Sequence, residues 1–163
     1  MQDLPTGWAS IYSNHGLVSF STSSGYRSSI HDPEGEHIVI DAASDDNALG
    51  QSLLLALEKS RVLHPNENAN FYNLSRIEED YEAFVSDLIT KFGELQRRKV
   101  FSKMLHCSVS VRSGEIFIRP TKKERGESWS GSGIKEEDIF RIPLSASPGE
   151  IGAGVKMALS KCK

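Results

Sequence analysis

Two segments of this chain resemble one another closely enough to predict that one structural unit occurs twice. Residues 49–61 read LGQSLLLALEKSR, and residues 151–163 read IGAGVKMALSKCK. A glycine, an alanine, a leucine and a lysine recur at equivalent places, and most other pairs exchange one apolar or one basic residue for another. An internal repeat constrains the fold strongly, because one sequence pattern must then pack in two places of one structure.

The elements expected before each segment also follow one order. Alternating apolar residues predict a hairpin in each half, then a polar loop, a short strand and a helix whose apolar residues share one face. Serine residues, Ser44 and Ser147, precede the two helices as candidate N-caps. In the first half, the hairpin strands are expected at 8–12 and 17–20, the polar loop at 21–36, the short strand at 38–40 and the helix at 49–61. The hairpin turn at 13–16 contains Asn14 and Gly16, which tolerate positive φ. In the second half, the hairpin strands are expected at 108–111 and 115–118, the polar loop at 119–133, the short strand at 139–142 and the helix at 147–163.

A helical insert separates the two halves. Apolar residues recur at a spacing of three to four from Ile77 to Phe92, and acidic residues occupy the opposite face. Ser75 and Glu78 form a candidate capping box, and Gly93 is expected to end the helix. A shorter helix from Leu95 is expected to turn Val100, Phe101 and Met104 inward and Arg97, Arg98, Lys99 and Lys103 outward.

These patterns predict an α+β fold, with a mostly antiparallel sheet of about six strands and three to four helices. We expect a single domain over 1–163, with pseudo-repeats at 7–61 and 105–163 and the helical insert at 75–104. A chain of 163 residues is long enough to bury a core without disulfides or metals. Cys107 and Cys162 are therefore expected to be free, buried thiols.

Charge and hydropathy narrow the functional classes. The chain has 19 basic and 22 acidic residues and a net charge of -3, so it lacks the basic surface that direct nucleic-acid binding requires. No stretch approaches the roughly 20 apolar residues of a membrane span, and residues 1–5 carry no targeting pattern. We expect a cytoplasmic protein that binds neither nucleic acid nor membrane.

A search for catalytic chemistry finds one weak candidate. His31, Asp32 and His37 lie in a short loop and supply ligand types that a divalent metal uses. No further histidine or cysteine lies nearby, and Asp-Pro favours a structural turn. The Ser-Gly-Ser-Gly run at 130–133 opens no helix and so forms neither a nucleophile elbow nor a phosphate loop. We expect no cofactor, no metal and no enzyme, with a small metal- or ligand-binding enzyme as the alternative.

Surface chemistry instead favours a protein partner. The two polar loops combine aromatic and charged side chains, which are the types that dominate binding energy at protein interfaces. The outer face of the long helix is acidic and suits a basic partner. The candidate partner-binding residues are Tyr26, Arg27, Asp32, Glu78, Glu79, Glu82 and Trp129. The aromatic ones could equally fold back over the core.

Several short motifs recur in a specific order along nearly the whole chain. They are Trp8-x-x-x-Tyr12, the run from Phe20 to Tyr26, His31-Asp32-Pro33-x-Gly35, Leu49-Gly50 followed by Ala56-Leu57-x-x-Ser60-Arg61, Trp129-Ser130-Gly131-x-Gly133, and Ser147-Pro148-x-Glu150-Ile151-Gly152 ending in Cys162-Lys163. In this order the chain resembles the immunity proteins of bacterial contact-dependent growth inhibition (CDI) systems.

This resemblance implies a binder that is not an enzyme. Immunity proteins of this kind sit in the cytoplasm and neutralise the C-terminal toxin domain of a large exported effector, often a nuclease, by stoichiometric occlusion. Their toxin contacts vary, so the resemblance assigns no contact by position, and shared motif residues such as Trp129 and His31 could serve the fold. A generic protein-interaction module is a second alternative.

Overall fold

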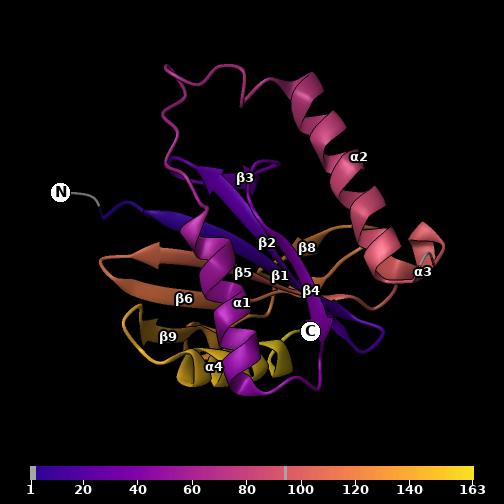
Figure 1. Ribbon diagram of the computed structural model, residues 1–163, viewed down its shortest axis with the longest axis vertical. Helices are drawn as coiled ribbons and strands as arrows, with labels where there is room; N and C mark the ends of the chain where they lie inside the picture. The colour runs from indigo at the N-terminus through magenta and orange to yellow at the C-terminus, as the bar shows by residue number, and fades with distance from the viewer. Residues whose placement is uncertain (1–2, 94) are drawn as a thin grey trace.

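A seven-stranded sheet divides the molecule into two layers of helices (Figure 1). The computed structural model describes residues 3–93 and 95–163. Helices α1 and α4 pack on one face of the sheet, and α2 and α3 pack on the other. The elements in chain order are β1 (Gly7–Asn14), β2 (Leu17–Gly25), β3 (Ser29–His31), β4 (His37–Asp41), α1 (Asp46–Glu58), α2 (Leu74–Lys91), α3 (Arg97–Phe101), β5 (Leu105–Arg112), β6 (Glu115–Pro120), β7 (Lys122–Lys123), β8 (Trp129–Ser130), η1 (Glu136–Asp138), β9 (Phe140–Pro143) and α4 (Pro148–Ser160).

The sheet is antiparallel throughout, and its two halves meet at its centre. The strand order is β3-β2-β1-β5-β6-β9, and β4 pairs with β2 beyond the end of β3. The central pair joins the first strand of each half, β1 and β5, with Ile11 opposite Cys107. On either side follow the second strands, β2 and β6, and then the strands that precede α1 and α4. The predicted α+β class is confirmed, and β7 and β8 add a separate two-stranded hairpin.

Helices α1 and α4 cross at a pair of glycines that the two similar segments place at equivalent positions. A β-carbon on Gly50 would lie 1.8 Å from the carbonyl oxygen of Pro148, and one on Gly152 would lie 1.7 Å from that of Asp46. Each glycine therefore admits the backbone of the opposite helix at its first residue. The recurring glycine thus has a packing explanation, while the duplication itself stays a prediction.

The polar loop expected at 21–36 is partly wrong. Residues 21–25 continue β2, where every residue is buried, and Ser29–His31 form β3. The serine-rich sequence has no apolar pattern that would predict a strand. These residues still form strands, because strand pairing satisfies the backbone hydrogen bonds regardless of how polar the side chains are. The loop expected at 119–133 likewise contains the end of β6 and the β7–β8 hairpin. In the β1–β2 turn, His15 and Gly16 have positive φ, whereas Asn14 ends β1.

Helix boundaries differ from expectation at two N-caps. Asp45, rather than Ser44, caps α1 by accepting a hydrogen bond from the Ala48 amide at 2.8 Å. The expected box at Ser75 is also wrong, because Asn73 caps α2 two residues before Ser75. Both caps are Asx residues, which are preferred at this position as strongly as serine is. The cap of α4 by Ser147, with Pro148 following, is confirmed.

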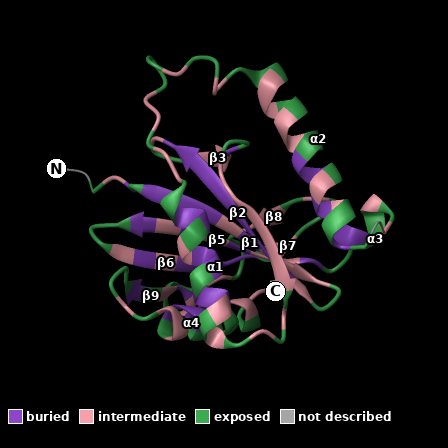
Figure 2. Cartoon of the chain, in the orientation of Figure 1, coloured by how far each residue is buried: buried purple, intermediate pink, exposed green. Residues whose placement is uncertain are grey.

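The helices at 74–101 form the second layer. Phe84, Val85, Leu88 and Phe92 of α2 pack with Val100, Phe101 and Met104 in a cluster separate from the main core. Gly93 follows the last turn of α2 with a φ of 93°, which confirms it as the end of that helix. Figure 2 shows that α2 buries a narrow stripe and exposes most of its surface. Among the described residues, no helix is long and apolar enough to cross a membrane.

Candidate interaction surface

The insert is fixed to the second half of the chain by a partly exposed cluster of ion pairs around Arg97. The Arg97 guanidinium donates to the Glu82 carboxylate at 2.6 and 3.0 Å and to the Glu127 carboxylate at 2.6 and 2.9 Å. Tyr81 also donates its hydroxyl to Glu127, at 2.5 Å. The hydrogen bond from Arg97 holds the pKa of Glu127 below its usual value. The bidentate contacts orient α2, α3 and the 124–128 loop relative to one another.

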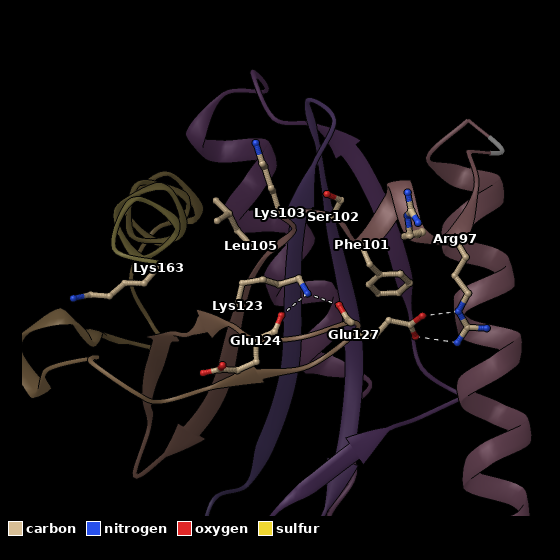
Figure 3. Close-up of a pocket in the computed structure, with 11 residues that line it drawn as sticks. Arg97, Phe101, Ser102, Lys103, Leu105, Lys123, Glu124, Glu127 and Lys163 are labelled. Atoms are coloured by element: carbon tan, nitrogen blue, oxygen red, sulfur yellow. Dashed lines mark hydrogen bonds and ion pairs between the residues drawn. The ribbon is translucent and has the colours of Figure 1, made fainter.

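A cavity of about 860 Å³ lies beside this cluster (Figure 3). Its floor is the apolar edge of Phe101 and Leu105, and its rim carries cations from α3 and from the end of the chain. Lys123 crosses the opening and donates to the carbonyl oxygens of Glu124 and Gly126. The rim cations are Arg98, Lys103 and Lys163, and they give this cavity a basic character.

Trp129, a predicted partner residue, packs the β7–β8 hairpin against the sheet and α3 on one face of the molecule. Its Nε1–H donates to the carbonyl oxygen of Met104 at 2.9 Å. Its ring lies 5.4 Å from that of Tyr12 and 5.1 Å from that of His106, between ring centroids. Lys123 lies over the ring, with its Nζ 5.2 Å from the centroid. The indole is half-buried, so only its edge is available to a partner.

The predicted residues Tyr26 and Arg27 lie at the far end of β2. Arg27 is exposed, and Tyr26 is half-buried with its ring edge against His64, at 4.8 Å between centroids. Trp129 and this turn are not brought together, because Trp129 packs against Tyr12 in β1 and the turn follows β2. The two polar loops therefore do not form one continuous aromatic patch.

Asp32 is a correction among the predicted partner residues. Its side chain is 0 % exposed, and its carboxylate accepts hydrogen bonds from Ser24 at 2.5 Å and from Arg61 at 2.8 and 2.9 Å. Burial alone would raise its pKa, but the bonds from Arg61 and Ser24 hold the pKa below the usual value. Asp32 ties the segment leaving α1 to β2, and its carboxylate is not available to a partner.

The loop considered for metal binding forms two separate hydrogen-bonded pairs instead. His37 Nδ1 lies 2.5 Å from Asp87 Oδ2, and His37 Nε2 lies 2.9 Å from the Ser19 hydroxyl. Burial lowers the pKa of His37 to about 4 although Asp87 opposes this, so the ring is neutral at pH 7. Within 3–93 and 95–163, no three His, Cys, Asp or Glu side chains are grouped as a metal ion would require.

The acidic residues of α2 do lie at the surface. Glu78, Glu79 and Glu82 are all exposed, and Glu82 is partly neutralised by Arg97. Glu78 and Glu82 line a second cavity, of about 690 Å³, between α2 and the sheet; Glu79 does not line it.

The sheet side of this α2–sheet cavity was missed at the sequence level. Ser21 of β2 and Ser108 of β5 lie opposite Ser10 of β1, so three serines form one row across three strands. All three line the cavity. The alternation of serine with apolar residues at 18–21 and 107–111 was the available signal, since side chains two apart share one face of a strand.

Comparison with known proteins assigns the family. A family model described as CDI immunity protein matches residues 7–162. The chain belongs to the CDI immunity protein family. Immunity protein CdiI-YPIII of Yersinia pseudotuberculosis serotype O:3 (strain YPIII) is 33% identical, in an alignment that covers 97% of this chain and 96% of that protein.

Solved structures agree with this assignment. A chain of the CdiA-CT/CdiI toxin and immunity complex from Yersinia pseudotuberculosis matches with a TM-score of 0.90 and 32% identity, over 99% of this immunity protein and 100% of that chain. A protein of unknown function, NMB0488 from Neisseria meningitidis, matches with a TM-score of 0.88 and 28% identity, over 100% and 99% of the two chains. The expected family resemblance is confirmed.

Proposed function

We propose that this protein neutralises the toxin domain of a CDI effector by binding it in a stoichiometric complex. The observation that carries the proposal is the match over essentially the full length to a chain of a toxin and immunity complex, at 32% identity and a TM-score of 0.90. The family model over residues 7–162 supports the same function. Neutralisation by binding requires no catalytic group on the inhibitor.

Occlusion is the mechanism that a chain of this size supports. An interface of about 1,600 Å² covers a toxin's active site or an adjacent surface that its substrate needs. The layer formed by α2, α3 and the 124–128 loop offers exposed charge and two cavities for such an interface. The first layer, by contrast, uses α1 and α4 to close the main core.

The contacts we propose are the exposed members of the predicted set. Glu78, Glu79 and Glu82 present carboxylates along α2, and Arg27 and the half-buried Tyr26 and Trp129 present edges elsewhere. Charge of this kind accelerates association and adds specificity more than it adds affinity. A basic toxin domain is the partner that an acidic helix favours, and many nucleases are basic because they bind phosphate. We propose a nuclease toxin and a cytoplasmic site of action on this ground.

The enzyme alternative receives no support from the residues that suggested it. Asp32 is enclosed by Arg61 and Ser24, and His37 is held by Asp87 and Ser19. Neither group is free to act as a base on a substrate. We propose that the protein is not an enzyme.

Co-expression tests the proposal directly. The toxin domain encoded beside this gene should arrest cell growth when expressed alone and should be harmless when this protein is expressed with it. The two purified proteins should also elute together in a 1:1 complex on size exclusion. Continued killing without complex formation would refute the proposed function. Nuclease action is tested separately, by incubating the free toxin with RNA and DNA.

A further inference from the structure

The cavity between α2 and the sheet has an unusual lining for a space so close to a core. Its floor carries serine side chains from β1, β2, β3 and β5, and its walls include the aromatic rings of Tyr12, Tyr81 and Phe84. Five serines line it: Ser10, Ser21, Ser23, Ser29 and Ser108. The opposite face of the same strands is apolar and packs against α1 and α4.

Two of these serines are buried without using their hydroxyls. Ser21 is 2% exposed and Ser23 is 5% exposed. Within the described part of the chain, neither hydroxyl forms a hydrogen bond, and neither does that of Ser108. Although both residues are largely buried, their hydroxyl oxygens are not among the described atoms that are fully buried without a partner, so they are accessible from the cavity; the Nδ1 atom of His31, which also lines the cavity, is buried and has no partner among the described residues. These hydroxyls therefore offer free hydrogen-bonding capacity to whatever enters the cavity.

The charge around the cavity has one sign. Glu78, Asp80 and Glu82 of α2 line it, and no lysine or arginine is among its lining residues in the part of the chain that the structure describes. Glu82 is shared with Arg97, and Asp80 lies 3.7 Å from Arg76, whereas Glu78 forms no ion pair within residues 3–93 and 95–163. Burial lowers the pKa of His31 and lowers that of His106 to about 4, so these two lining rings are neutral at pH 7.

We infer that this α2–sheet cavity receives an arginine or lysine side chain of the toxin domain. A basic side chain brings only hydrogen-bond donors, and the cavity supplies acceptors in its serine hydroxyls and carboxylates. Aromatic walls suit both the alkyl stem and the cation, through packing and cation–π attraction. Binding of this kind makes the cavity a specificity pocket, because a toxin without a basic residue at that place would cover Glu78 and the serine hydroxyls of the cavity without pairing them. The inference rests on the proposed function and identifies the part of the surface that reads the toxin.

Paired carboxamide variants on one helix test the inference. Glu78→Gln removes a charge from the cavity, and Glu79→Gln removes the same charge from the neighbouring position, which does not line it. Both variants should slow association with the toxin domain about equally and in a salt-dependent way. Only Glu78→Gln should accelerate dissociation, by about tenfold, as measured by surface plasmon resonance with the purified toxin domain.

A second pair removes the dependence on charge. Ser21→Ala with Ser23→Ala deletes the two unpaired hydroxyls, and the double variant should bind the toxin domain several-fold more weakly while circular dichroism shows an intact fold. Ser145→Ala, in the exposed turn after β9, is the control and should bind as wild type, because its hydroxyl forms no hydrogen bond within the described residues. Each basic residue of the toxin domain can then be substituted by Gln in turn. One of these substitutions should weaken binding to the wild-type protein but have no further effect on binding to the Glu78→Gln variant.

The outcomes separate this inference from the proposed function. A wild-type protein that binds the toxin, with unchanged dissociation rates for Glu78→Gln and for the double serine variant, would overturn the cavity inference and leave the proposed function standing. Equal effects of Glu78→Gln and Glu79→Gln on dissociation would also overturn it, since the acidic helix would then act as a whole. Failure of the wild-type protein to bind would overturn the proposed function itself.

Discussion

The two faces of the sheet are built on different principles. On one face, α1 and α4 bring glycine against backbone and fill the space above the strands with alkyl side chains such as Leu53 and Ile151. On the other, α2 contacts the strands near one end and leaves a hydroxyl-lined cavity along its length. In the proposed complex, stability and recognition are thereby separated, because residues of the α2 face can change without altering the main core.

The largest effect is expected at the α1–α4 crossing. Gly50→Ala or Gly152→Ala places a methyl group within 1.8 Å of backbone, so the helices must move apart, at a cost of about 3 kcal/mol or more in the free energy of unfolding. Urea denaturation followed by circular dichroism measures this loss. Gly149→Ala is the control, because its nearest neighbour would be 4.0 Å away and alanine favours the helix. Unchanged stability in Gly50→Ala would show that the crossing is looser than described.

The next effect is expected where the segment after α1 joins the sheet. Asp32→Ala leaves Arg61 and Ser24 without their acceptor, and we expect a loss of about 3 kcal/mol in unfolding free energy. Glu34→Ala removes the other partner of Arg61, at 2.9 Å, but that carboxylate is 68% exposed and its loss should have little effect. Toxin affinity of the folded Asp32→Ala protein should match wild type. Weaker toxin binding by the folded variant would indicate that Asp32 contributes to the interface.

A smaller, pH-dependent effect on the free energy of unfolding is expected on the face of the sheet that α2 covers. Burial lowers the pKa of His106 to about 4 in the folded protein, whereas a histidine in the unfolded chain has a pKa near 6.5. The folded protein therefore protonates this imidazole only at a lower pH than the unfolded chain does. Stability present above pH 6.5 is therefore lost as the pH falls towards 4, by up to about 3 kcal/mol for this group. In urea denaturation at pH 7 and pH 4.5, His106→Phe should reduce the difference in the free energy of unfolding between the two pH values. An equally steep dependence in the variant would assign the effect to other groups.

The smallest effect on global stability is expected at the Arg97 cluster. Arg97→Ala removes a partly exposed set of ion pairs, so the melting temperature should fall by no more than about 3 °C. Amide hydrogen exchange in α2 should nevertheless become faster, while that of α1 and α4 stays unchanged, because the second layer can open without the first. Lys156→Ala, which removes a similar surface pair with Asp46, is the control and should leave exchange in α2 unchanged.

The same contrast explains what the sequence could predict. Helical periodicity and turn residues located all four α-helices to within a few residues, whereas the recurrence of glycine at 50 and 152 indicated a possible repeat and did not predict the helix crossing. The β2 strand beyond Phe20 and the β3 strand were missed, because serines there are buried by pairing with neighbouring strands and carry no apolar signal.

The candidate site was harder to predict than the fold. The acidic helix was recognisable from its composition, but burial of Asp32 depends on Arg61, which lies 29 residues away in the chain. The serine row likewise exists only once β1, β2 and β5 are aligned. Contacts between distant segments are what a local pattern cannot carry.

The pairing of β1 with β5 at the centre of the sheet affects how fast the chain can fold. Ile11 lies opposite Cys107, and the close approach of Gly50 to Pro148 also joins segments that are far apart in the chain. Proteins dominated by such distant contacts fold slowly, because a long loop must close before the contacts form. A partly synthesised chain that lacks β5 has no centre to its sheet, so protection depends on completed molecules. We therefore expect protection to come from molecules that have already folded when a toxin arrives.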